Sequence, residues 1–157
     1  MKNKILIKII ILFAHWSVIG KRGIIRKLFI ILIRRLSKET GNMELIINKV
    51  PFIIHFDTDF KAIFETYNIR EINFLRDNLD KKGVFIDLGA NYGYYSQTIS
   101  FHNLVEKIIS IEPNGRFSER IKDSYSLMLN RKKNISPIFV ENIAISNLKK
   151  ESYLNLD

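Results

Sequence analysis

The sequence from Val84 to Ser96 reads VFIDLGANYGYYS, and a strand, a turn and the start of a helix can be recognised in it. Val84–Leu88 is short and apolar, which is typical of a strand buried on both faces of a parallel sheet. Gly89 and Gly93 let the backbone turn sharply and let a ligand approach main-chain atoms closely. The stretch therefore predicts a strand–turn–helix unit with room for a ligand at the turn.

The flanking sequence extends this unit into a β-α-β-α-β order. Before the strand, apolar residues at helical spacing predict a helix from Asn68 to Leu79, followed by Gly83 in the left-handed conformation. The elements expected after the turn are a helix from Tyr94 to about His102, a strand Ile108–Glu112, a helix Gly115–Asn130 and a strand Pro137–Asn142. Short connections between alternating strands and helices predict a doubly wound, Rossmann-like α/β sheet.

Composition limits the chemistry of the chain. Its 157 residues are enough for one ordinary domain, and 46% hydrophobic residues are ample for a core. The chain has no cysteine, which excludes disulfides, thiolate metal sites and cysteine nucleophiles. The three histidines, His15, His55 and His102, lie far apart without ligand spacing, so no metal site is expected.

The formal net charge of +9 is concentrated in an N-terminal arm, residues 1–41. Ten of the 25 basic residues but one of the 16 acidic residues fall in this arm, so equal numbers of each sign remain in residues 42–157. A neutral body offers no basic face for phosphates, and no nucleic-acid partner is expected. We therefore predict two parts, a basic, apolar helical arm at 1–41 and a domain at 42–157.

The role of the arm stays open between three interpretations. Its longest uncharged run, Ile9–Gly20, has 12 residues, fewer than the roughly 20 that a membrane-spanning helix needs. Gly23–Leu36 has the pattern of a basic amphipathic helix, which suits a membrane surface. Packing of both helices against the domain is the third interpretation. A cytoplasmic location, or one at the inner face of the membrane, is expected.

Between the arm and the first helix, the alternating apolar residues of Met43–Phe56 predict strands with a turn at Asn48-Lys49. Asp57 and Asp59 follow this segment. Two acids at the end of a strand favour a turn or a cap over a metal site.

Two ligand classes compete for the glycine turn. A dinucleotide site normally reads G-x-G-x-x-G with a pyrophosphate over the helix N-terminus, but Asn91 replaces the middle glycine here. Asp87 precedes the turn and would repel a pyrophosphate, whereas it suits a ligand with a cationic amino group. Glu112 ends the next strand, where a carboxylate can accept hydrogen bonds from ribose hydroxyls; NAD sites share this feature. The pattern favours S-adenosylmethionine over NAD.

The same residues resemble a known family. FIDLGANYGYYS is similar to the D-[IL]-G-A-N-x-G-Y-[YF]-[ST] signature of FkbM-type methyltransferases, a class I S-adenosylmethionine-dependent family. IISIEPN at Ile108–Asn114 and NIAIS at Asn142–Ser146 resemble later stretches of the family, and Arg70-Glu71 stands where it often has Tyr-Glu. The resemblance covers roughly residues 57–156.

The resemblance implies a fold, a cofactor and a reaction. The fold would be a class I methyltransferase sheet, and the cofactor S-adenosyl-L-methionine. The residues implied to bind the cofactor are Asp87, Gly89, Asn91 and Gly93 for its methionine and ribose part, Glu112 for the ribose hydroxyls and Asn142 near the adenine. The reaction would be methyl transfer to a hydroxyl oxygen of a small-molecule or glycan acceptor. No residue of the sequence stands out as a general base.

The sequence also departs from this family. The family's sheet has about seven strands, whereas the third predicted strand ends at Asn142 and no K-x-D-x-E-G-x-E stretch follows. We therefore expect residues 42–157 to form the N-terminal half of a methyltransferase domain, truncated after about the third strand, with Val84–Leu88 left as an edge. Two alternatives stay open: an NAD- or nucleotide-sugar-binding Rossmann domain, and a non-catalytic membrane-associated protein.

Overall fold

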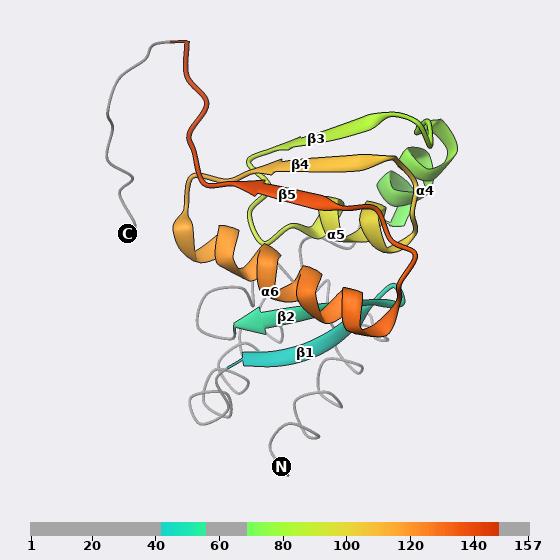
Figure 1. The fold of residues 1–157 in the computed structure, drawn as a ribbon, viewed down its shortest axis with the longest axis horizontal. Coiled ribbons are helices and arrows are strands. Elements are labelled where there is room, and N and C mark those ends of the chain that lie inside the picture. Colours follow the sequence, from blue (N-terminus) through green and yellow to red (C-terminus); the bar gives the residue numbers. More distant parts are fainter. Residues whose placement is uncertain (1–41, 56–68, 148–157) are drawn as a thin grey trace, which may run out of the picture. The chain divides into compact units, whose positions relative to one another are not determined.

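The computed structural model describes residues 42–55 and 69–147 (Figure 1). The arm at 1–41 and the pair Asp57 and Asp59 lie outside these residues, so what the sequence predicts for them stays a prediction. Within the described residues, no helix is long and apolar enough to cross a membrane. The same part of the chain contains no cluster of three or more histidine or acidic side chains that could hold a metal ion.

The first described element is the hairpin that the alternating apolar residues predict. β1 (Asn42–Ile47) and β2 (Val50–His55) pair in a two-stranded sheet. The turn residues Asn48 and Lys49 have φ angles of 49° and 70°, the left-handed pair that a type I′ turn requires. Ile47, Val50 and Phe52 are buried.

The three strands that follow α4 form a parallel sheet in the order β3-β4-β5. Their bounds are Val84–Leu88 for β3, Lys107–Ile111 for β4 and Ile138–Glu141 for β5. The helices are α4 (Ile69–Asn78) before β3, α5 (Tyr94–Phe101) between β3 and β4, and α6 (Gly115–Arg131) between β4 and β5. This order confirms the Rossmann-like α/β fold.

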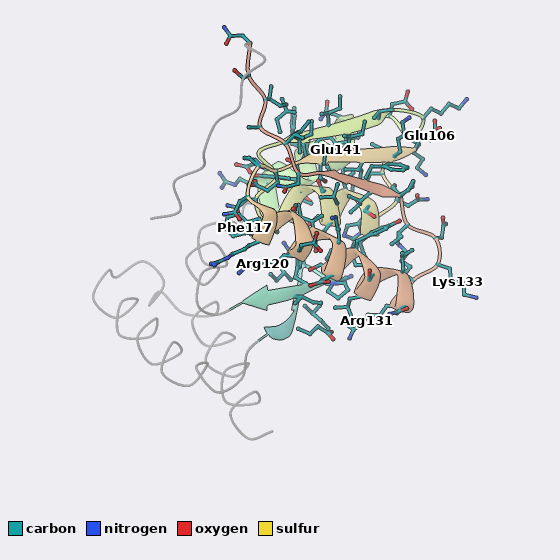
Figure 2. The ribbon with its side chains drawn as sticks, turned by 60° about the vertical axis from the view of Figure 1, so that its left-hand side comes forward. Glu106, Phe117, Arg120, Arg131, Lys133 and Glu141 are labelled. Carbon is teal, nitrogen blue, oxygen red and sulfur yellow. The ribbon has the colours of Figure 1, made fainter. Side chains whose placement is uncertain are left out.

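Helices α5 and α6 cover one face of the sheet, and the core lies between them and the strands (Figure 1). Ile108 of β4, Ile99 of α5 and Ile121 and Met128 of α6 are all fully buried there. The alternation of side chains along β4 directs Ile108 and Ser110 toward the helices. On α6, the Arg120 guanidinium lies 5.2 Å from the centroid of the neighbouring Phe117 ring (Figure 2).

Two expectations from the sequence need correction. β3 is not buried on both faces, because Val84, Ile86 and Leu88 are 46%, 55% and 62% exposed. In the described part of the chain no helix covers this face, and no strand pairs with the outer edge of β3. Gly83 does not take the left-handed conformation: α4 ends earlier, and Gly83 N donates instead to Asp80 O (2.8 Å) in a tight turn.

Candidate cofactor site

The turn after β3 is held by the end of the neighbouring strand. Gly89 N and Ala90 N both donate to the carbonyl oxygen of Ile111, at 2.9 and 3.0 Å, and Gly93 N donates to Ala90 O at 2.8 Å. Gly89, Asn91 and Gly93 all have positive φ, at 73°, 52° and 79°. Left-handed residues at alternate positions fold the chain tightly over the end of the sheet, which explains the choice of two glycines and an asparagine.

The two glycines of this turn have different reasons to be glycine. A Cβ added at Gly93 would lie 2.8 Å from both Gln97 Nε2 and Ile121 Cγ1, so Gly93 allows α5 to pack closely on α6. A Cβ added at Gly89 would have no atom within 4 Å. Space on the side-chain side of Gly89 is what a ligand lying against the turn would need. Gly93 therefore shapes the fold, and Gly89 faces the candidate site.

Glu112 fixes the turns after β3 and β4 to each other. Its Oε2 accepts a hydrogen bond from Asn91 N (2.7 Å) and its Oε1 accepts one from Asn114 N (2.8 Å). The residue is 6% exposed. A carboxylate has about four acceptor positions, so these two bonds leave acceptor capacity for ligand hydroxyls. The geometry suits the sequence-based role of Glu112 at a ribose.

Asp87 lies at the end of a short relay of hydroxyl groups. Ser110 Oγ donates to Ser96 Oγ (2.6 Å), and Ser96 Oγ donates to Asp87 Oδ2 (2.6 Å). Ser96 N also donates to Asp87 Oδ2, at 3.3 Å. Burial raises the pKa of Asp87, the Ser96 hydrogen bonds oppose this rise, and the negative charge of Glu112 adds to it. Asp87 and Glu112 thus form a pair of like charges on adjacent strands.

Asn142 ties the ends of β4 and β5 together. Its Nδ2 donates to the backbone oxygens of Glu112 (2.8 Å) and Pro113 (2.9 Å). The side chain is exposed, and its Oδ1 would lie 3.4 Å from a Cβ placed at Gly115. Asn142 therefore holds the loop that follows Glu112, and this positioning role was not foreseen from the sequence.

The structure brings five of the six sequence-derived site residues to one end of the sheet. They follow or end the three parallel strands on the carboxyl side, where ligands of open α/β sheets bind. The members of this group are Asp87, Gly89, Asn91, Glu112 and Asn142. Gly93 stands apart, because its contacts are with the helices behind the turn.

Sequence reasoning missed the polar residues that support this group. Ser96 and Ser110 position Asp87, and Gln97 Nε2 donates to Tyr92 O (2.7 Å) within the turn. The one available signal was the placement of Ser110, a hydroxyl within the apolar strand sequence KIISI. Gln97 and Ser96 are fully buried in a helix that reads as ordinary amphipathic sequence.

Comparison with known proteins supports the fold and goes no further. No family model matches the sequence, and no curated protein matches it. A Pyrococcus horikoshii protein named as a candidate transferase is similar in structure, with a TM-score of 0.53, 12% identity, and coverage of 75% of this chain and 49% of that one. At this identity the likeness shows the Rossmann-like fold alone.

Two further solved structures share part of the fold. TYW2 from P. horikoshii, in complex with MeSAdo, has a TM-score of 0.49 at 15% identity, covering 64% of this chain and 36% of that one. The tRNA (uracil-54, C5)-methyltransferase of Pyrococcus abyssi, in complex with S-adenosyl-L-homocysteine, has a TM-score of 0.44 at 8% identity, covering 65% and 24%. The chain thus spans about half or less of the length of all three proteins.

Proposed function

We propose that this chain is part of an S-adenosylmethionine-dependent methyltransferase of the FkbM type, acting on a hydroxyl of a sugar or other natural product. The observation that carries the proposal is the pair of carboxylates, Asp87 and Glu112, on either side of a turn whose Gly89 faces open space.

The residues present fit the proposed cofactor at both of its polar ends. Glu112 is held by two backbone amides and keeps acceptor positions for the two ribose hydroxyls. Asp87 accepts from Ser96 on one oxygen, Oδ2, which leaves the carboxylate able to accept from an ammonium group. Gly89 lets the ligand lie against the backbone between them.

S-adenosylmethionine, when bound, supplies a methyl group that its sulfonium makes electrophilic. The protein would mainly have to align the acceptor with the cofactor, because the acceptor oxygen must approach in line with the S–CH₃ bond that breaks. Within the described residues, Glu112 and Asp87 would fix the cofactor from two sides, and the hydrogen bonds of Asn91 and Asn142 keep the turns from shifting. The proposal of a hydroxyl acceptor rests on the family resemblance alone.

Isothermal titration calorimetry of the purified chain with S-adenosylhomocysteine and with NAD tests the proposal. We expect S-adenosylhomocysteine to bind more tightly, and Glu112→Ala to weaken it by about 1–3 kcal/mol, the loss of a hydrogen bond to a charged group. Glu141→Ala is the matched control, since Glu141 is an exposed acid at the end of the adjacent strand (Figure 2). Tighter binding of NAD, or no binding of either ligand at millimolar concentration, would contradict the assignment.

For the arm at 1–41 we propose contact with the inner face of the membrane, on the basis of its basic amphipathic sequence. Flotation with anionic liposomes should then depend on residues 1–41. Equal flotation of the chain without them would remove this part of the proposal.

A further inference from the structure

Two buried serines, Ser96 and Ser110, lie behind the carboxylate of Asp87. Ser96 belongs to the first turn of α5 and Ser110 to β4, and neither side chain is exposed to solvent. Parallel pairing sets Asp87 of β3 opposite Ser110. Buried hydroxyl groups need hydrogen-bond partners, and the hydrogen bonds of both serines run toward Asp87. The two serines therefore belong to the candidate site as well as to the core.

The charge of Asp87 fixes the direction of these hydrogen bonds. An ionised carboxylate accepts and does not donate, so Ser96 must use its one hydroxyl hydrogen on Asp87 Oδ2 (2.6 Å). Ser96 then has no hydroxyl hydrogen left for its neighbour, and Ser110 must donate to Ser96 Oγ (2.6 Å). Hydrogen bonds in a chain polarise one another, so the bond from Ser110 strengthens the bond that Ser96 donates to the carboxylate.

The two oxygens of the Asp87 carboxylate have different surroundings. Oδ2 accepts from both the hydroxyl group and the backbone N–H of Ser96, at 2.6 and 3.3 Å. Oδ1 accepts no hydrogen bond from the described residues. In the same part of the chain, the buried side-chain atoms without a partner are Gln97 Oε1 and Thr98 Oγ1, so Asp87 Oδ1 is not enclosed. The relay thus occupies one oxygen and leaves the other accessible.

Protonation of Asp87 would change what the accessible oxygen offers. Because two donors already face Oδ2, the proton of a neutral carboxyl group belongs on Oδ1, which would then donate. Burial raises the pKa of Asp87, the Ser96 hydrogen bonds oppose this rise, and the negative charge of Glu112 adds to it. The other titratable groups on this side are Tyr95 of α5 and Glu71 of α4, which are hydrogen-bonded to each other. The bonds from Ser96 are therefore what favours the ionised, accepting state.

We propose that Ser110 and Ser96 together determine the ligand specificity of the site, because they keep Asp87 Oδ1 an acceptor and so favour a ligand with an ammonium group there. An ammonium group donates three hydrogens and accepts none, so it fits an ionised Oδ1 and conflicts with a protonated one. Ser110 acts through Ser96, as a positioning residue. This inference rests on the proposed function, since the ammonium group is that of the methionine part of S-adenosylmethionine.

The first test measures Asp87 in the full chain without a ligand. The pKa of Asp87 is followed by NMR of its carboxyl carbon, with Asp87→Asn identifying the signal. Ser96→Ala should raise this pKa, and Ser110→Ala should raise it by less, because each removes part of the stabilisation of the charged state. Ser100→Ala is the matched control: Ser100 is also buried in α5, but its hydroxyl donates to Ser136 O (2.5 Å), outside the relay. An unchanged pKa in both relay variants, Ser96→Ala and Ser110→Ala, or an equal rise in the control would overturn the inference.

The second test compares S-adenosylhomocysteine with its deaminated analogue, in which hydrogen replaces the ammonium group. Calorimetry from about pH 4 to about pH 8 covers the range above the ordinary pKa of Asp87. The affinity for S-adenosylhomocysteine should fall as the pH drops through the pKa of Asp87, and at a higher pH in both relay variants. At about pH 5, Ser96→Ala should weaken binding about tenfold, the loss of a hydrogen bond to a charged group, and Ser110→Ala about two- to fourfold. The analogue should bind the relay variants and the original chain equally well.

The two ligands separate this inference from the proposed function. Equal loss of affinity for both ligands in the relay variants would show a general structural effect; the inference would then fail and the proposed function would stand. If S-adenosylhomocysteine does not bind the original chain, the proposed function fails and the ligand assigned to Asp87 fails with it. The NMR titration of Asp87 decides the role of the two serines in either case.

Discussion

Replacement of Glu112 by glutamine is expected to destabilise the folded chain even without a ligand. Each oxygen of the Glu112 carboxylate accepts one backbone N–H, Oε2 from Asn91 at 2.7 Å and Oε1 from Asn114 at 2.8 Å. These amides belong to the turns after β3 and β4. One side chain therefore ties the ends of two strands, and a change in its acceptors acts on both turns.

The size of the effect follows from the atoms involved. Glutamine keeps the shape of glutamate but has one carbonyl oxygen, and its NH₂ group would face the second backbone amide as a donor against a donor. A hydrogen bond to a charged group contributes about 1.5–3 kcal/mol, and the residue is 6% exposed, so water has little access to replace it. We expect the free energy of unfolding to fall by about 2–3 kcal/mol.

Urea denaturation followed by circular dichroism at neutral pH measures this change. Glu141→Gln is the control: Glu141 is exposed, and its backbone carbonyl accepts from Glu112 N (3.0 Å) whatever its side chain is. A surface change of this kind should stay within about 0.5 kcal/mol of the original chain. If Glu112→Gln also stays within that range, or if both variants lose the same amount, the two bonds assigned to the carboxylate do not hold the turns.

Three further predictions concern single side chains. Both Gly93→Ala and Gly89→Ala place an alanine at positive φ, but Gly93→Ala should destabilise the chain more in urea denaturation, because its added Cβ would also meet Gln97 and Ile121 at 2.8 Å. Gly89→Ala should in addition weaken the binding of S-adenosylhomocysteine in calorimetry; equal stabilities of the two variants would contradict this. The pKa of Asp87 is raised by burial above its ordinary 3.8, so the folded chain binds the proton more tightly and loses stability, relative to Asp87→Asn, as the pH rises above 3.8 toward the raised pKa. Urea midpoints of both chains across this range would refute the reasoning if their difference stayed constant. Burial and the hydrogen bond to Glu71 raise the pKa of Tyr95 to about 12, so Glu71→Gln should lower that pKa in an ultraviolet titration, with Tyr95→Phe identifying the signal; an unchanged titration would show that Glu71 does not act on this phenol.

Local sequence pattern was sufficient to predict the elements of the sheet. Val84–Leu88 matches β3 residue for residue, and α6 differs from its expected bounds by one residue, because apolar spacing is a local signal. The exposure of Ile86 could not be predicted from the sequence. A fully apolar strand has the same sequence whether its second face is covered or not, so burial on both faces was the wrong prediction for the described chain.

The sequence pattern was sufficient to predict that Asp87 and Glu112 lie at the carboxyl ends of adjacent strands, but not which residues support them. Asp87 and Glu112 stand at fixed offsets from a glycine turn, so a sequence shows them directly. The Ser110–Ser96–Asp87 relay joins β4, α5 and β3, and it exists only because parallel pairing sets Asp87 beside Ser110. The difference between Gly89 and Gly93 likewise depends on α6, whose Ile121 lies against one glycine and not the other.

The like charges of Asp87 and Glu112 would distinguish a cationic ligand from an anionic one on energetic grounds. Burial is the main cause of the raised pKa of Asp87, and the negative charge of Glu112 adds to it, so both make ionisation of Asp87 less favourable. A pyrophosphate would add negative charge to this arrangement. A ligand that carries an ammonium and a sulfonium would relieve it, and its binding would therefore lower the pKa of Asp87. The proton uptake or release that accompanies binding thus distinguishes the two ligand classes, because S-adenosylmethionine should favour loss of the Asp87 proton and NAD should favour its retention.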